Sequence, residues 1–147
     1  MALNTGKVIA GGLVAGAALS VVGYIVDGVI LGDRMAAEAN AFRPGTSALM
    51  MSSQAMTISI ISNFVMGLLL VWTYAAVRPR LGPGPGTAAT VGGLFWIIGM
   101  IVALGYLQMG MMSWSLWWEY SLFWLINLLI AAVIGGKLYS EDGGATA

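Results

Sequence analysis

Four uninterrupted apolar runs dominate the chain. They cover residues 8–31, 56–77, 88–112 and 114–136. Each is long enough to cross a hydrocarbon layer of about 30 Å, which takes roughly 20 helical residues. Because the runs are continuously apolar and do not alternate, they predict membrane helices and not strands of a barrel. The sequence therefore predicts an all-α membrane protein, a single four-helix transmembrane domain over residues 1–147.

The first apolar run also has features of a secretory signal peptide. Lys7 precedes it, and Ala37-Glu38-Ala39 has the small-x-small form of a cleavage site. However, the run is longer than the usual apolar region of a signal peptide, which is about 7–15 residues. We therefore expect a membrane helix here.

Basic residues in the connections predict the orientation of the helices. With four spans both termini lie on the same side, and basic residues are enriched in short cytoplasmic loops. The side of the termini holds four of them and the opposite side holds two: Lys7, Arg78, Arg80 and Lys137 against Arg34 and Arg43. We therefore expect both termini in the cytoplasm, with the protein in the inner membrane of a bacterium.

The composition excludes several classes of protein. Hydrophobic residues make up 59% of the chain and charged residues only 8%, whereas about a quarter of the residues of a soluble domain are charged. Six basic and six acidic residues cancel, which leaves no basic patch for nucleic acid. The chain has no histidine and no cysteine, the usual ligands of zinc, haem and iron–sulfur clusters. We expect no metal, no cofactor and no catalytic residue, and so no enzyme.

Small residues recur at helical spacing along the first and third apolar runs. In a membrane such residues let two helix backbones approach closely. They are Gly12, Gly16, Ser20 and Gly23 on the first run, and Gly92, Gly99, Ala103 and Gly110 on the third. Tight packing inside the bundle is one interpretation, and contact with another subunit is the alternative. The polar residues Asn63, Gln108 and Asn127 are expected to form hydrogen bonds between helices.

Asp27 and Glu119 are the only charged residues inside the apolar runs. An ionisable group within a membrane is costly unless it is paired or hydrated, so both are candidates for proton or cation handling. The structural alternatives for Asp27 are a bond to a tyrosine or tryptophan donor or a pair with Arg34, about 10 Å further along the helix axis. The structural alternative for Glu119 is that it reaches interfacial water or stabilises the N-terminus of its helix.

The connection that follows the second apolar run is rich in proline and glycine. Over residues 78–86 it is expected to end the second helix, with Thr87 as the N-cap of the third. Arg78 and Arg80 either bind anionic lipid headgroups or set the orientation. The stretch Arg-Pro-Arg-Leu-Gly-Pro-Gly-Pro resembles loops of small bacterial membrane proteins, and this resemblance implies no activity.

These observations favour a non-catalytic accessory or structural subunit. It would pack into a larger bacterial membrane complex, such as a photosynthetic or respiratory assembly. Its partners would be the lipid bilayer and either other membrane subunits or further copies of itself. The alternative is a small oligomeric transporter or channel that uses Asp27 and Glu119 to handle protons or cations.

Overall fold

The computed structural model describes residues 3–140, which form helices and their connections. In chain order the elements are α1 (Thr5–Gly23), the π-helix η1 (Tyr24–Ile30), α2 (Gly32–Phe42), α3 (Thr46–Met50), α4 (Ser53–Leu81), α5 (Pro85–Gln108) and α6 (Trp114–Leu138). Four helical segments are long and apolar enough to cross a membrane: Thr5–Ile30, Ser53–Leu81, Pro85–Gln108 and Trp114–Leu138. The predicted class, an all-α integral membrane protein with four spans, is confirmed.

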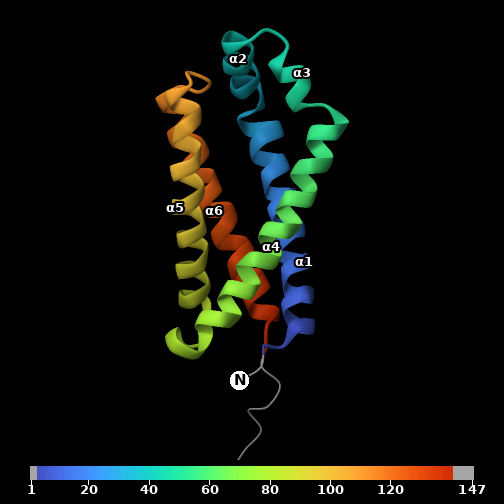
Figure 1. Ribbon diagram of the computed structural model, residues 1–147, viewed down its shortest axis with the longest axis vertical. Helices are drawn as coiled ribbons and strands as arrows, with labels where there is room; N and C mark the ends of the chain where they lie inside the picture. Colours follow the sequence, from blue (N-terminus) through green and yellow to red (C-terminus); the bar gives the residue numbers. More distant parts are fainter. Residues whose placement is uncertain (1–2, 141–147) are drawn as a thin grey trace, which may run out of the picture.

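The four long helices run along the long axis of the molecule (Figure 1). The start of α1, the end of α6 and the α4–α5 loop lie at one end, here called the terminal end. The short helices α2 and α3 and the α5–α6 turn lie at the other, here called the distal end. α1 packs against α4 and α6, and α5 packs against α6. α4 and α5 approach each other near the terminal end and diverge toward the distal end.

The core is built on close contact between helix backbones. A Cβ atom placed on Gly67 of α4 would lie 2.4 Å from both the Gly12 carbonyl oxygen and the Gly16 nitrogen of α1. A Cβ atom on Gly11 would lie 2.7 Å from the Gly135 carbonyl oxygen of α6. These distances are too short for any side chain larger than hydrogen. Glycine therefore lets α1 pack directly onto α4 and α6.

The second span extends beyond its expected end. The prediction that the proline-rich connection ends this helix near residue 77 is wrong, because α4 continues through Pro79 to Leu81. A proline removes one backbone hydrogen bond and usually kinks or ends a helix, yet this helix continues for two residues after Pro79. The helix ends at Gly82, whose φ of 83° is a conformation that favours glycine.

The third helix also begins earlier than predicted. Its N-cap is Gly84 and its first residue is Pro85, a position where proline has no bond to lose. Thr87 is therefore not the N-cap. Its hydroxyl donates instead to the carbonyl oxygens of Leu81 and Gly82, at 3.3 and 2.7 Å, and so ties the loop to the helix.

The α5–α6 turn ends the third span before the predicted residue 112. Gly110 has a φ of 71°. Its nitrogen donates to Leu107 and the nitrogen of Met111 donates to Tyr106, at 3.0 and 2.9 Å. This is a Schellman motif, which closes a helix by using its last free carbonyl groups. α6 then starts after Ser113, whose side chain accepts from the Leu116 nitrogen at 3.3 Å.

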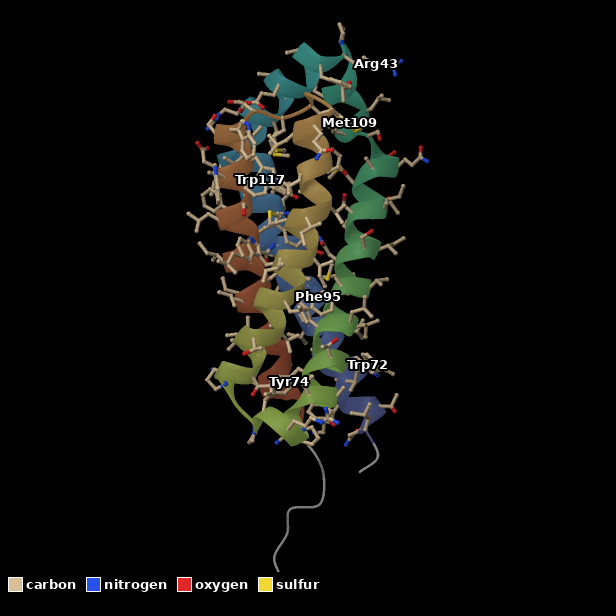
Figure 2. All side chains as sticks on the ribbon, turned by 60° about the vertical axis from the view of Figure 1, so that its left-hand side comes forward. Arg43, Trp72, Tyr74, Phe95, Met109 and Trp117 are labelled. Atoms are coloured by element: carbon tan, nitrogen blue, oxygen red, sulfur yellow. The ribbon has the colours of Figure 1, made fainter. Side chains whose placement is uncertain are left out.

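Aromatic side chains gather at both ends of the spans, as Figure 2 shows for Trp117 toward the distal end and for Trp72 and Tyr74 near the terminal end. At the start of α6, Trp117 makes edge contacts with Trp114 and Trp118, with ring centroids 6.1 and 4.9 Å apart. Tryptophan and tyrosine concentrate at the two membrane–water interfaces. Their placement agrees with helices that cross a bilayer.

Candidate functional site

An ion pair ties α2 to α6 at the distal end. The Arg34 guanidinium pairs with the Glu119 carboxylate and donates a second hydrogen bond to the Ser115 hydroxyl at 3.1 Å. Both charged side chains are open to solvent, 44% and 43% exposed. The hydrogen bond to Glu119 raises the pKa of the Arg34 guanidinium further above its ordinary value. The pair between Arg34 and Asp27, one of the alternatives for that acid, is not formed, because Arg34 binds Glu119 of α6 instead.

Glu38 makes a second tie between α2 and α6. Its carboxylate oxygens accept from the backbone nitrogen and from the hydroxyl of Ser113, each at 2.6 Å. Ser113 is the N-cap of α6, and a negative charge is favourable at a helix N-terminus. Sequence reasoning missed Glu38 as a site residue. An acidic residue between two apolar runs was visible in the sequence, but its partner, Ser113, lies 75 residues further along the chain.

Asp27 lies within η1, the π-helical end of the first span. The side chain is exposed, and it forms no hydrogen bond or ion pair within residues 3–140. Its electrostatic neighbour is Tyr120 of α6, which also interacts with Tyr106 of α5. π-helices are rare and occur frequently at functional sites. Asp27 and Glu119 do not share a hydrogen-bond partner, because Glu119 binds Arg34.

Two of the three predicted polar links are formed between helices. The Asn63 amide donates to the Ser20 hydroxyl at 3.4 Å, and that hydroxyl donates to the Gly16 carbonyl oxygen. The Asn127 amide donates to the Leu19 carbonyl oxygen at 3.2 Å. Gln108 is exposed at the end of α5 and makes no such link in the described part of the chain.

The predicted small residues of the first span lie in helix contacts. Gly12 and Gly16 pack on α4, as described above. A Cβ atom on Gly23 would lie 3.8 Å from the Asn127 amide nitrogen. The small residues of the first span therefore pack against other helices of the same chain.

The small residues of the third span behave differently. A Cβ atom on Gly92 would lie 3.1 Å from the Leu128 carbonyl oxygen, and Ala103 is buried. Gly99 meets nothing within 4 Å, and Gly110 forms the turn. Neither Gly99 nor Gly110 therefore packs on another helix within the described residues, so contact with another subunit stays the alternative for this part of α5.

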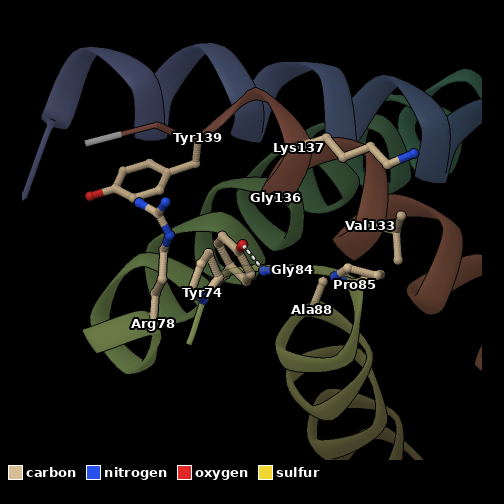
Figure 3. A pocket seen from close by; sticks show the side chains of 10 residues that line it. Tyr74, Arg78, Gly84, Pro85, Ala88, Val133, Gly136, Lys137 and Tyr139 are labelled. Carbon is tan, nitrogen blue, oxygen red and sulfur yellow. Dashed lines mark hydrogen bonds between the residues drawn. The ribbon is translucent and has the colours of Figure 1, made fainter. Parts of the chain in front are cut away.

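A small cavity of about 200 Å³ lies at the terminal end, between the end of α4, the start of α5 and the end of α6 (Figure 3). Arg78 lines it, with its guanidinium carbon 5.6 Å from the centre of the Tyr139 ring. Lys137 also lines it, whereas Arg80 is exposed outside it. Lys137 was predicted only to set the orientation, and the two lining tyrosines, Tyr74 and Tyr139, were not predicted as site residues. All three residues lie near the ends of α4 and α6 on the same side of the bundle, and this was the feature of the sequence that could have identified them.

No group of three or more acidic, histidine or cysteine residues that could hold a metal ion occurs among residues 3–140. Comparison with family models, with curated proteins and with solved structures finds no match to the chain. The candidate site therefore has two polar parts of different character. One is the unpaired acid on η1, and the other is the basic cavity at the terminal end.

Proposed function

We propose that the protein is a non-catalytic subunit of a larger assembly in a bacterial inner membrane, where its helices pack against helices of another subunit. The observation that carries this proposal is the position of Asp27. Its carboxyl group is exposed, lies in a candidate span and has no hydrogen-bond or ion-pair partner in the described chain.

An acid in this position is stabilised by a binding partner or by water. An ionisable group within a membrane costs several kcal/mol unless it is paired or hydrated. Asp27 lies near Tyr120, and Tyr120 also interacts with α5, the helix that diverges from α4 toward the distal end (Figure 1). A helix of another subunit that carries a basic or hydroxyl side chain would remove the cost by binding Asp27.

The exposed glycine of α5 supports the same proposal. Gly99 meets nothing within 4 Å inside the chain. In a membrane, an uncovered glycine lets a partner helix approach the backbone closely. The chain thus offers a small-residue contact on α5 and an unpaired acid on η1.

The transport alternative has less support. It requires Asp27 and Glu119 to handle a proton or cation together. Glu119 is bound by Arg34 at the surface of the distal end, so only Asp27 has its carboxylate available. We therefore do not propose a transport function, and the experiment below would reveal it if the accessory-subunit proposal fails.

The experiment compares assembly with the stability of the isolated chain. The protein is extracted from its native membranes in mild detergent, and the mass and composition of the native particle are determined. We expect stoichiometric foreign subunits with the wild-type chain and their loss with Asp27→Leu. The purified Asp27→Leu chain should be at least as stable to heat as wild type, because the variant removes an unpaired acid.

Glu119→Gln is the matched control, because that acid already has its partner in the chain. It should leave the assembly intact. A lone homo-oligomer in the wild-type extract would overturn the accessory-subunit proposal and redirect the work to proton and cation flux through reconstituted protein. Loss of stability and assembly together in Asp27→Leu would assign Asp27 a role inside the chain.

A further inference from the structure

The short helix α3 lies between α2 and the start of α4 at the distal end (Figure 1). Its first residues are bonded to α2 and to the turn before it. The Asn40 amide donates to the Ser47 hydroxyl at 2.8 Å, and the Ser47 backbone nitrogen donates to the Asn40 side-chain oxygen at 3.1 Å. The Thr46 hydroxyl donates to the Arg43 carbonyl oxygen at 2.8 Å. These bonds hold α3 against α2 by its polar side.

The remaining side chains of α3 are apolar and uncovered. Leu49 is 66% exposed, Met51 directly after the helix is 68% exposed, and within residues 3–140 no residue of α3 is buried. Leu49 follows Ser47 by two positions, which places the two residues on nearly opposite sides of a helix. Isolated helices this short are unstable in water, and helices in proteins are stabilised mainly by packing an apolar face. The described part of the chain does not provide that packing for Leu49.

The start of α4, just after α3, shows what surrounds this region. Residues 56–62 of α4 are all exposed. They make almost two helical turns, so no side of the helix is buried there by the described chain. The stretch belongs to a candidate span, and its large apolar side chains are Met56, Ile58, Ile60 and Ile61. In the isolated chain, lipid covers these side chains. The exposed apolar surface of α3 precedes this surface by only a few residues and is continuous with it.

We propose that α3 is an interfacial anchor, a segment that lies at the surface of the bilayer beside the start of α4. Its side chains Leu49, Met50 and Met51 enter the boundary between the lipid headgroups and the acyl chains. Amphipathic helices at this boundary bury an apolar face and keep their polar face out of the lipid. In α3 the polar face is the one that bonds to α2. The anchor holds the start of α4 at a fixed depth, and it does not depend on the subunit function proposed above.

The test makes use of a chain that has no cysteine. The variants Leu49→Cys and Arg43→Cys each receive one environment-sensitive fluorophore, and the full-length proteins are reconstituted into phosphatidylcholine vesicles. Arg43 is the matched control, because it is an exposed residue of the same α2–α3 segment and lies at the distal tip (Figure 2). Quenching is measured with iodide on both sides of the membrane and with lipids that carry a quencher near the headgroup. We expect the lipid quencher to act several-fold more strongly on the Leu49 label, and iodide to act more strongly on the Arg43 label.

Hydrogen exchange tests the anchor without a label. In the same vesicles, Leu49→Ser should make amide exchange in α3 several-fold faster, because the contact that stabilises this helix is lost. Exchange in α1 and α6 should stay unchanged. Arg43→Gln is the control for a substitution in the same segment, and it should leave exchange in α3 at the rate of the wild type.

Three results would overturn the proposal. Equal quenching of the Leu49 and Arg43 labels by iodide would show that α3 stands in water. A Leu49 label that neither iodide nor the lipid quencher reaches would show that a second copy of the chain covers α3. Unchanged exchange of α3 in Leu49→Ser would show that contact of Leu49 with lipid does not stabilise the helix.

Discussion

The terminal and distal halves of the molecule are held together by different interactions. In the terminal half and the middle, glycine backbones of α1, α4 and α6 touch directly, and Gly67 lies against Gly12 and Gly16. In the distal half, α4 and α5 diverge (Figure 1). Two smaller apolar clusters, around Leu116 and around Trp117, join the helices there, together with the surface contacts of Arg34 and Glu38. Backbone packing in lipid depends on shape, whereas exposed ion pairs contribute little and weaken with salt.

This difference indicates where the chain is rigid and where it can adapt. The glycine contacts allow one arrangement of α1 against its neighbours, because any added atom collides with backbone. The exposed polar contacts at the distal end involve long side chains that reorient at low cost. A partner subunit would therefore find a fixed scaffold at one end and an adjustable surface at the other.

Gly67→Ala should give the largest effect. The added Cβ atom would meet the backbone of α1, so α1 and α4 must separate. We expect a loss of about 2–3 kcal/mol in the free energy of unfolding, typical of overpacking against atoms that cannot rotate away. Thermal unfolding in detergent measures it. Gly99→Ala is the control in open space, and its unfolding should stay within about 1 kcal/mol of wild type, the size of the helix-propensity difference. Equal losses of unfolding free energy in Gly67→Ala and Gly99→Ala would show that the close backbone contact at Gly67 does not control stability.

Asn127→Leu should give an intermediate effect. The variant removes the hydrogen bond to the Leu19 carbonyl oxygen but also removes a buried amide oxygen that has no partner in the described chain. Hydrogen bonds between membrane helices average about 0.6 kcal/mol, so we expect a loss of at most about 0.6 kcal/mol. Asn63→Leu, which breaks a longer bond of 3.4 Å, is compared by thermal unfolding. A larger loss of unfolding free energy for Asn63→Leu would show that the shorter hydrogen bond is not the more stabilising one.

Arg34→Gln should give the smallest effect on global stability and a local effect on α2. The ion pair with Glu119 is exposed, so its loss should free α2 without unfolding the bundle. Hydrogen exchange should become faster in α2 and stay unchanged in α1 and α4. High salt should have the same effect on the wild type, because it screens exposed charges. Arg43→Gln is the control, since Arg43 forms no ion pair within residues 3–140. Unchanged exchange in α2 would show that Glu38 holds it alone.

Much of the fold was predictable because it depends on local properties of the chain. The length and continuity of the apolar runs indicate four spans, and the spacing of Gly12 and Gly16 marks a face on which α4 packs. Helix ends were harder to predict, because Pro79 stays inside α4 and Gly110 stops α5 by its backbone conformation. The π-helical turn around Asp27 has no simple pattern in the sequence.

The candidate site was predicted less well, because its partners lie far apart along the chain. Arg34 pairs with Glu119 and not with Asp27, although Asp27 is the nearer acid in sequence. The cavity likewise brings Tyr74 and Arg78 of α4 together with Lys137 and Tyr139 at the end of α6. Periodicity places each residue on a face of its own helix but does not say which other helix that face meets.

The contact between Gly11 and Gly135 has a consequence for biosynthesis. These glycines lie near opposite ends of the chain, yet their backbones touch in the finished bundle. The ribosome makes α1 first and α6 last, so the surface of α1 that receives α6 stays uncovered until the whole chain has entered the membrane. α5 and α6, joined by a short turn, can enter as a paired hairpin and then dock on α1. The contact between Gly11 and Gly135 therefore forms only after α6 has been synthesised.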